Sequence, residues 1–309
     1  MDFDFVSVIV PAHNEEEYIN KCLSSLKFQD YPKDKYEIIV VDNDSQDRTQ
    51  DIARQFNVKL IFQDTGPVGA VRNAGAKQAK GELLAFIDAD CTAPVDWLSK
   101  GVSLISKNEA VYGGGCDIQE APHWIERAWL LKNKTAPKDL LGCCIFIKKD
   151  IFLKIGMFDE DITSGEDTKL SNSLKIHYHL VVMTEDLNVI HLGNPATLKA
   201  FFLRQVWHSE NYLQNWHETR LDPTFYFLLV FLFGLLSFIL QMADKSINGY
   251  FLSIAIVFGI PSVFTAKRLR RSKKPLKNLR NLPAIYVLDF VYVCGRTLGL
   301  CKSAWKVIK

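Results

Sequence analysis

The chain lacks any Cys-x-x-Cys pair, and its seven cysteines are an odd number in 309 residues. These absences argue against a zinc site of paired cysteines and against a disulfide framework, so we expect reduced thiols, as in the cytosol. The first residues are acidic, and no basic stretch precedes an apolar run, so we expect no signal peptide. No Gly-x-Gly-x-x-Gly sequence follows the first apolar strand, which argues against a Rossmann dehydrogenase.

The net charge is also small, +2, but it is unevenly distributed. Eight basic residues and no acidic residue lie between positions 267 and 280, so the rest of the chain carries +2 − 8 = −6. A basic run can bind nucleic acid, but this one adjoins apolar segments of membrane length. We therefore expect anionic membrane lipids as its partner, and no nucleic acid.

Residues 1–195 alternate between short apolar runs and amphipathic stretches, which predicts an α/β fold. The expected strands are residues 6–10, 37–41, 58–62, 83–87 and 145–147, and the expected helices are residues 15–27, 48–56, 68–79 and 95–106. Such alternation favours a mostly parallel sheet with helices on both faces. Ligands of these sheets bind at the carboxyl ends of the strands.

Three apolar runs follow. Residues 225–243 contain no charge over 19 positions, about 28 Å as a helix and close to the thickness of a bilayer core. Residues 246–266 are also uncharged, and only Asp244 and Lys245 separate the two runs, which predicts a transmembrane hairpin, with a buried core hairpin as the alternative. Residues 282–300 carry Asp289 and Arg296 on one helical face and fit either a third span or an interfacial helix. Because Lys and Arg concentrate on cytoplasmic loops, the basic block predicts a multi-pass cell-membrane protein with a cytoplasmic N-terminal domain.

One apolar strand ends in Asp88-Ala89-Asp90. Paired carboxylates at the exit of a buried strand suit a hard divalent cation, Mg²⁺ or Mn²⁺. Because Pro94 and the helical pattern after it end the strand, the two carboxylates can diverge, one toward the metal and one toward a bound water or ribose. The Asp-x-Asp spacing alone is common on protein surfaces, so its meaning depends on the strand before it.

Two further features lie at strand exits or helix starts. Asp42 ends an apolar strand, where its carboxylate can accept hydrogen bonds from a base N–H or ribose hydroxyls; helix capping is the equal alternative. Arg72 lies in the stretch Gly66-Pro67-Val68-Gly69-Ala70-Val71-Arg72, whose small residues let a ligand approach a helix N-terminus. The planar guanidinium can bind a diphosphate, and a plain surface arginine is the alternative.

Four more sites complete the candidates. Gly114 lies in a run of three glycines that permits close approach of a ligand or forms a flexible loop. Glu166 and Asp167 open a helical stretch, either as capping acids or with one of them as general base. His191 follows a strand-like run at 187–190 and is either structural or a metal ligand. Arg204, Trp207 and His208 lie on a helical stretch just before the predicted transmembrane segments, where we expect them to contact the acceptor. The alternative is that they only anchor the chain at the membrane–water interface.

Five motifs, in this order, resemble those of the family 2 inverting glycosyltransferases with the GT-A nucleotide-diphospho-sugar transferase fold. They are Val8-Ile9-Val10-Pro11-Ala12-His13-Asn14-Glu15, Val41-Asp42-Asn43-Asp44-Ser45, Arg72-Asn73-Ala74-Gly75, Phe86-Ile87-Asp88-Ala89-Asp90 and Gly165-Glu166-Asp167. The resemblance covers residues 5–210. It implies a nucleotide-sugar donor, a divalent metal and transfer of the sugar with inversion at its anomeric carbon.

The resemblance also implies roles for individual residues. Asp167 matches the catalytic base of the Glu-Asp motif, and Glu166 beside it orients the acceptor or the base. Asp90 is the expected direct metal ligand, with Asp88 and His191 as further ligands. The donor-binding positions are Pro11, Glu15, Asp42, Arg72 and Asp88.

One motif departs from the family pattern. Processive synthases carry Gln-x-x-Arg-Trp after the Glu-Asp motif, whereas residues 204–208 read Arg-Gln-Val-Trp-His, which argues against polymerisation. We therefore predict transfer of one sugar from a UDP- or GDP-sugar to a lipid-linked or membrane-associated acceptor. The alternatives are a polyprenyl-phosphate glycosyltransferase and a non-catalytic nucleotide-binding scaffold. The expected domains are a catalytic domain at 1–220, a transmembrane hairpin at 221–266, a basic cytoplasmic loop at 267–281 and a third transmembrane or interfacial helix at 282–309.

Overall fold

The computed structural model describes residues 4–108, 110–132, 136–177, 180–214, 216–244 and 250–308. The chain forms two compact units. The first, called the sheet unit, comprises Met1–Gln119 and Ala136–Gly193, and the second, called the helical unit, comprises Glu120–Thr135 and Asn194–Lys309. The division after Gly193 differs from the domain boundary expected at residue 220, because the chain from residue 194 groups with the apolar helices.

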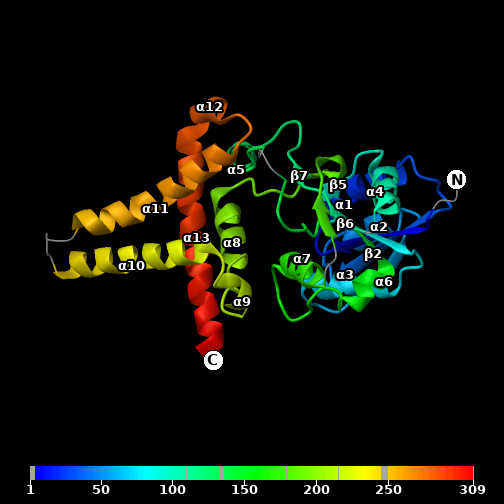
Figure 1. Cartoon of the computed structure of the whole chain (residues 1–309), viewed down its shortest axis with the longest axis horizontal. Helices are drawn as coiled ribbons and strands as arrows, with labels where there is room; N and C mark the ends of the chain where they lie inside the picture. Colours follow the sequence, from blue (N-terminus) through cyan, green and yellow to red (C-terminus); the bar gives the residue numbers. More distant parts are fainter. Residues whose placement is uncertain are drawn as a thin grey trace. The chain divides into compact units, whose positions relative to one another are not determined.

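A seven-stranded sheet organises the sheet unit (Figure 1). Its strand order is β3 (Lys59–Gln63), β2 (Tyr36–Asn43), β1 (Val6–Ala12), β4 (Leu83–Phe86), β8 (Ile145–Lys148), β6 (Ala110–Gly113) and β9 (Leu180–Met183). Only β8 runs antiparallel to its neighbours, β4 and β6. All five expected strands form, and the sheet is mostly parallel, as predicted.

Helices cover both faces of this sheet. Alternate side chains of β1 point to opposite faces: Val8 belongs to one buried cluster and Ile9 to another. The first cluster packs under α1 (Ile19–Lys27) and α4 (Trp97–Lys107), and the second packs under α3 (Val68–Lys77), α6 (Lys149–Lys154) and α7 (Glu166–Ile176). A short helix, α2 (Thr49–Ala53), follows β2.

The first helix begins later than its sequence pattern predicts. Helix α1 starts at Ile19 rather than at Glu15. The Glu15 backbone N–H donates instead to the Thr49 hydroxyl at 2.7 Å, so residues 15–18 form a turn that is held against the segment after β2. This turn keeps Glu15 at the carboxyl end of the sheet.

A second, smaller sheet contains β5 (Cys91–Thr92), β10 (Val189–His191) and β7 (Cys116–Asp117). His191 lies within β10 instead of after it, and Leu187 belongs to a 3-10 turn, η1 (Glu185–Leu187). The antiparallel register places His191 directly opposite Cys91, the residue after Asp90. This small sheet therefore joins the chain after the Asp-x-Asp motif to the predicted histidine ligand.

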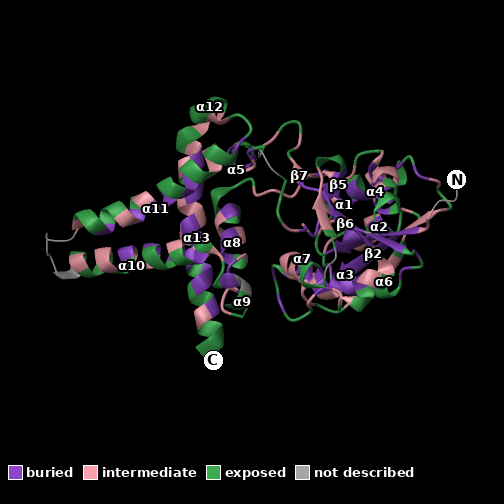
Figure 2. Cartoon of the chain, viewed as in Figure 1, coloured by how far each residue is buried: buried purple, intermediate pink, exposed green. Residues whose placement is uncertain are grey.

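The helical unit contains α5 (Trp124–Trp129), α8 (Leu198–Trp207), α9 (Trp216–Thr219), α10 (Pro223–Asp244), α11 (Tyr250–Arg271), α12 (Pro275–Asn278), η2 (Leu279–Asn281) and α13 (Leu282–Ile308). Three segments are long and apolar enough to cross a membrane: Pro223–Met242, Tyr250–Arg271 and Pro275–Ile308. Most of the surface of α10 and α11 is exposed or half-buried (Figure 2). The predicted connection at Lys245 lies outside the described residues.

The predicted basic loop is largely helical. Its first four basic residues, up to Arg271, lie in the last turns of α11, and Lys277 lies in α12. Within the bundle Asp289 is fully buried, accepts from Thr265 at 2.9 Å and pairs with Arg268 at 2.7 Å. Pairing compensates this buried charge, as a carboxylate inside an apolar bundle requires.

Helix α13 runs across the α10–α11 hairpin and packs lengthwise against α8 (Figure 1). Gly295 permits this approach, since a Cβ there would lie 2.8 Å from the Gln205 Cβ. The apolar segments therefore form a hairpin and a transverse helix instead of three parallel helices.

Candidate active site

Three neighbouring parallel strands deliver most of the predicted donor-site residues. The order β2, β1, β4 places Asp42 at the exit of β2 beside Ala12 of β1, with Asp88 beyond the end of β4. Pro11 is buried within β1, and Glu15 follows in the turn after it. The carboxyl edge of the sheet thus gathers several acids, as expected for a parallel arrangement.

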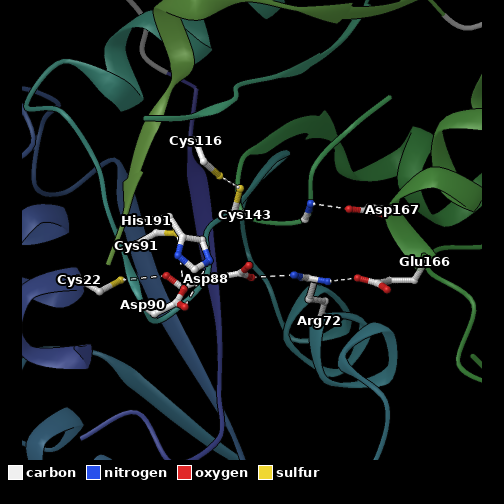
Figure 3. Close-up of polar contacts among 11 residues, drawn as sticks. Cys22, Arg72, Asp88, Asp90, Cys91, Cys116, Cys143, Glu166, Asp167 and His191 are labelled. Atoms are coloured by element: carbon white, nitrogen blue, oxygen red, sulfur yellow. Dashed lines mark hydrogen bonds and ion pairs between the residues drawn. The ribbon is translucent and has the colours of Figure 1, made fainter. Parts of the chain in front are cut away.

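Arg72 of α3 bridges two of the motifs (Figure 3). Its guanidinium donates to Asp88 Oδ1 at 2.6 Å and to Glu166 Oε1 at 2.6 Å. Only 4 % of the Arg72 side chain is exposed, and 7 % of that of Glu166. Burial alone would lower the pKa of Arg72, but the facing Asp88 and Glu166 carboxylates raise it above its ordinary value. The guanidinium is therefore held between carboxylates, an environment different from the predicted diphosphate contact.

Gly142 makes room for this bridge. A Cβ at Gly142 would lie 2.7 Å from the Arg72 Cζ, too close for any other residue without movement of the guanidinium. The Gly142 N–H also donates to Asp167 Oδ2 at 3.1 Å. One glycine thus contacts both the bridging arginine and the predicted base, although no sequence motif marks it.

Asp167 lies in the first turn of α7, beside Glu166. The helix begins after Gly165, whose φ of +87° is accessible to glycine at little cost. Burial, followed by the neighbouring Glu166 charge, raises the pKa of Asp167 to about 6, against the opposing effect of Arg72. A carboxylate with a pKa near neutrality is a better proton acceptor than an ordinary aspartate.

The second group of donors surrounds Asp90 (Figure 3). Asp90 Oδ2 lies 3.3 Å from His191 Nε2, and ligand atoms of Asp90, Cys91 and His191 all lie within 4.8 Å of one another. Gly193 leaves space for the Asp90 carboxyl group, whose carbon would lie 3.0 Å from a Cβ at that position. Cys91 was missed as a candidate, although its place directly after Asp90 was a usable signal.

These donors fit a divalent cation. Burial, and then repulsion from Asp90 and Asp88, raise the pKa of Glu15 to about 8, so the acids at this edge crowd one another without a compensating cation. Carboxylate oxygens with an imidazole nitrogen suit Mn²⁺ as well as Mg²⁺. Arg72 occupies one Asp88 oxygen, whereas Asp90 Oδ2 and His191 Nε2 lie 3.3 Å apart and belong to the group of ligand atoms that could hold one cation.

Asp42 is not a helix cap. Its Oδ2 accepts from the Ser45 N–H at 3.2 Å and the Gln50 amide at 2.8 Å, while Asp47 accepts from the Thr49 N–H at the start of α2. The second oxygen, Oδ1, is buried and has no hydrogen-bond partner among the described residues. A buried acceptor without a donor is costly, so this oxygen is suited to a donor group of a ligand.

The predicted acceptor residues do not form one group. Gly114 is buried, and a Cβ there would lie 2.5 Å from the Leu187 carbonyl carbon, so its small size serves the packing of the strand against η1. In the helical unit, Arg204 and His208 line one cavity, whereas Trp207 is 41 % exposed and is not part of that lining. Sequence spacing on α8 alone could not separate these residues.

Comparison with known proteins assigns the family. The model of glycosyl transferase family 2 matches residues 7–154. Glycosyltransferase AglE of Haloferax volcanii is 33 % identical over 206 residues, which cover 62 % of this chain and 68 % of AglE. Poly(ribitol-phosphate) β-N-acetylglucosaminyltransferase TarS of Staphylococcus aureus is 36 % identical over 181 residues, covering 52 % of this chain and 30 % of TarS, so the chain matches less than a third of that relative.

A solved structure shares the fold. Mannosyltransferase PcManGT from Pyrobaculum calidifontis, in complex with GDP-Man and Mn²⁺, superposes with a TM-score of 0.62 at 18 % identity, over 99 % of this chain and 88 % of PcManGT. The fold is therefore GT-A-like, followed by three long apolar helices. The chain belongs to glycosyltransferase family 2 and transfers a sugar from a nucleotide-sugar donor.

Proposed function

We propose that this chain transfers a single sugar, with inversion, from a UDP- or GDP-sugar to a lipid-linked or membrane-associated acceptor. The observation that carries the proposal is the Arg72 bridge, which ties Asp88 of the Asp-x-Asp motif to Glu166 of the Glu-Asp motif within the sheet unit. A direct displacement needs two groups in the same complex: one that stabilises the leaving diphosphate and a base that accepts the proton of the acceptor hydroxyl. The bridge connects Asp88 and Glu166, which lie in the same motifs as the groups proposed for these two tasks, Asp90 and Asp167.

The donor end of the site is assigned to the strand exits. Asp42 Oδ1 accepts from the nucleoside, through a base N–H or a ribose hydroxyl, and so satisfies a buried oxygen. Pro11 and Glu15 flank the nucleoside position from β1 and the turn after it. PcManGT binds GDP-Man, and one TarS structure holds UDP-GlcNAc, so both nucleotide classes occur among proteins similar to this chain.

Asp90 and His191 would hold the divalent cation, with the free oxygen of Asp88 nearby. Such a cation, when bound, neutralises the charge of the leaving diphosphate. PcManGT contains Mn²⁺, which supports this choice of metal. The protein's own part is to orient the Asp88 carboxylate through Arg72 and the Asp90 carboxylate against His191.

Asp167 acts as general base. A sugar hydroxyl is a weak nucleophile, and a positioned carboxylate that accepts its proton contributes about 10²- to 10⁴-fold in rate. The Gly142 N–H orients one oxygen of Asp167, and Glu166 raises its pKa. Glu166 itself is buried against Arg72, so its role is positioning rather than direct contact with the acceptor.

The apolar helices anchor the enzyme to a membrane. The α10–α11 hairpin crosses the bilayer, and α13, which runs across that hairpin, lies along the interface (Figure 1). The basic end of α11 and α12 faces the cytoplasm and anionic lipids, which keeps the catalytic residues cytoplasmic. A reporter inserted after Lys273 should accordingly give a cytoplasmic signal, and an external signal would reverse this orientation.

The decisive experiment is a donor-turnover assay with full-length protein in detergent. Release of nucleotide from a panel of UDP- and GDP-sugars should require Mn²⁺ or Mg²⁺ and stop with a chelator. Asp167→Asn should lower transfer about 10²- to 10⁴-fold while donor binding persists. Asp161→Asn, an exposed acid of the same segment, is the matched control. Full transfer by Asp167→Asn would remove Asp167 as the base.

A further inference from the structure

A cavity of about 240 Å³ lies within the helical unit, between α5, α8 and α13. Its walls are aromatic and aliphatic at Ile125, Trp129 and Phe201. Its polar groups include two arginines, Arg204 of α8 and Arg296 of α13. A site of this kind, mostly apolar with a few convergent polar groups, is typical of a small-ligand pocket.

Arg296 is half-buried, and its hydrogen-bond acceptors are neutral. Its guanidinium donates to the His208 carbonyl at 3.1 Å and the Tyr212 hydroxyl at 3.0 Å, both neutral acceptors. The buried Nε has no hydrogen-bond partner in the described part of the chain. Within residues 194–214 and 250–308, as elsewhere among the described residues, no carboxylate forms an ion pair with Arg296 or Arg204.

One acid does line the cavity. Glu126 is buried there and accepts from the Asn194 amide at 3.2 Å. Two guanidinium groups thus line the cavity with one carboxylate, and Asp222, outside this lining, also interacts electrostatically with Arg296. His208 responds to this field: burial, and then the charges of Arg296 and Arg204, lower its pKa to about 3, so its imidazole is neutral at physiological pH. An anion is the ligand that would lower the cost of holding two half-buried arginines beside one cavity.

We propose that this cavity binds the phosphate or diphosphate headgroup of the lipid-linked acceptor, with Arg204 and Arg296 on the phosphate oxygens. The inference rests on the proposed function and adds the chemical class of the acceptor. The size fits such a headgroup with the first carbons of its chain against Trp129 and Phe201, and is too small for a nucleotide-sugar. The candidate membrane helices of the same unit supply an apolar surface for the rest of the chain.

Binding of farnesyl phosphate to the full-length protein in detergent tests this assignment without donor or metal. Calorimetry should detect binding of farnesyl phosphate to the protein. Farnesol and inorganic phosphate should each bind at least about tenfold more weakly than farnesyl phosphate. Arg204→Gln should lower the affinity for farnesyl phosphate about tenfold or more, because a charge-assisted hydrogen bond is lost. Arg204 is half-buried and forms no ion pair within the described part of the chain, so this variant should fold more readily than one at Arg296.

Lys199→Gln is the matched control, because it removes one exposed positive charge from the same helix. It should leave farnesyl phosphate binding within about twofold. Three outcomes would overturn the proposal. If inorganic phosphate bound as tightly as farnesyl phosphate, the cavity would be a free-phosphate site, and if farnesol bound as tightly, it would be an apolar pocket. If Arg204→Gln and Lys199→Gln weakened farnesyl phosphate binding equally, the attraction would be diffuse and not specific to the cavity. Failure of the proposed function is a separate outcome, because it appears as absence of metal-dependent donor turnover in the wild-type protein.

Discussion

Arg72 in the sheet unit is buried and Arg296 in the helical unit is half-buried, and the two arginines are compensated in different ways. Arg72 in the sheet unit forms ion pairs with two carboxylates at 2.6 Å each, so its charge is compensated by residues of the same unit. Arg296 in the helical unit donates to a carbonyl and a hydroxyl, at 3.1 and 3.0 Å, and lies over the rings of Tyr212 and Tyr292. A buried charge that is paired positions other groups, whereas one with neutral partners keeps its attraction for a ligand. The comparison therefore assigns Arg72 to positioning and Arg296 to binding.

The largest effect on stability should separate these two arginines. Arg72→Gln leaves the buried Glu166 and the half-buried Asp88 without their partner, which should cost about 3–5 kcal/mol in free energy of unfolding. Arg296→Gln removes a charge with no carboxylate partner and should cost only about 1–3 kcal/mol through its lost hydrogen bonds. Denaturant unfolding of the detergent-solubilised protein measures both. Equal costs for the two variants at neutral pH would contradict the proposed distinction.

A smaller effect should follow from filling the space beside the bridge. Gly142→Ala places a methyl group against the Arg72 guanidinium, which two ion pairs hold in place, and should cost about 1–3 kcal/mol in free energy of unfolding. Gly66→Ala is the control, because a Cβ there meets its nearest neighbour at 3.7 Å, an ordinary contact. If Gly142→Ala were as stable as Gly66→Ala, the bridge would be looser than its distances indicate.

Much of the fold could be predicted because its signals are local. All five strands expected from apolar runs form, and the uncharged runs become long helices. The predicted start of α1 was wrong because a residue distant in sequence determines it: Glu15 stays outside α1, since its N–H donates to the Thr49 hydroxyl. The basic block became helical because α11 continues through Arg271, and charge pattern alone does not distinguish a helix end from a loop.

The candidate site was less predictable than the fold. Motif order indicated Asp88, Asp90 and Asp167 as chemically important, but Arg72 is 94 positions from the Glu166 it contacts, and no local pattern encodes that contact. Gly114 has a packing reason that only the structure reveals. The role of Arg296 depends on α13 meeting α8, which places it beside Arg204 in one cavity, and this meeting is not a property of the residues around Arg296 in the sequence.

The smallest effect concerns the pH dependence of transfer. Asp167 must be ionised to accept a proton, and burial with the Glu166 charge raises its pKa to about 6. The rate should therefore be constant above that value and fall about tenfold for each unit below it, because only the ionised fraction reacts. Glu166→Gln removes one of the two causes and should move this limb of the rate profile to lower pH. His208 has a pKa of about 3 and therefore does not change its charge between about pH 5 and 7. A rate profile that is flat over this range at saturating donor would show that Asp167 is not the titrating base.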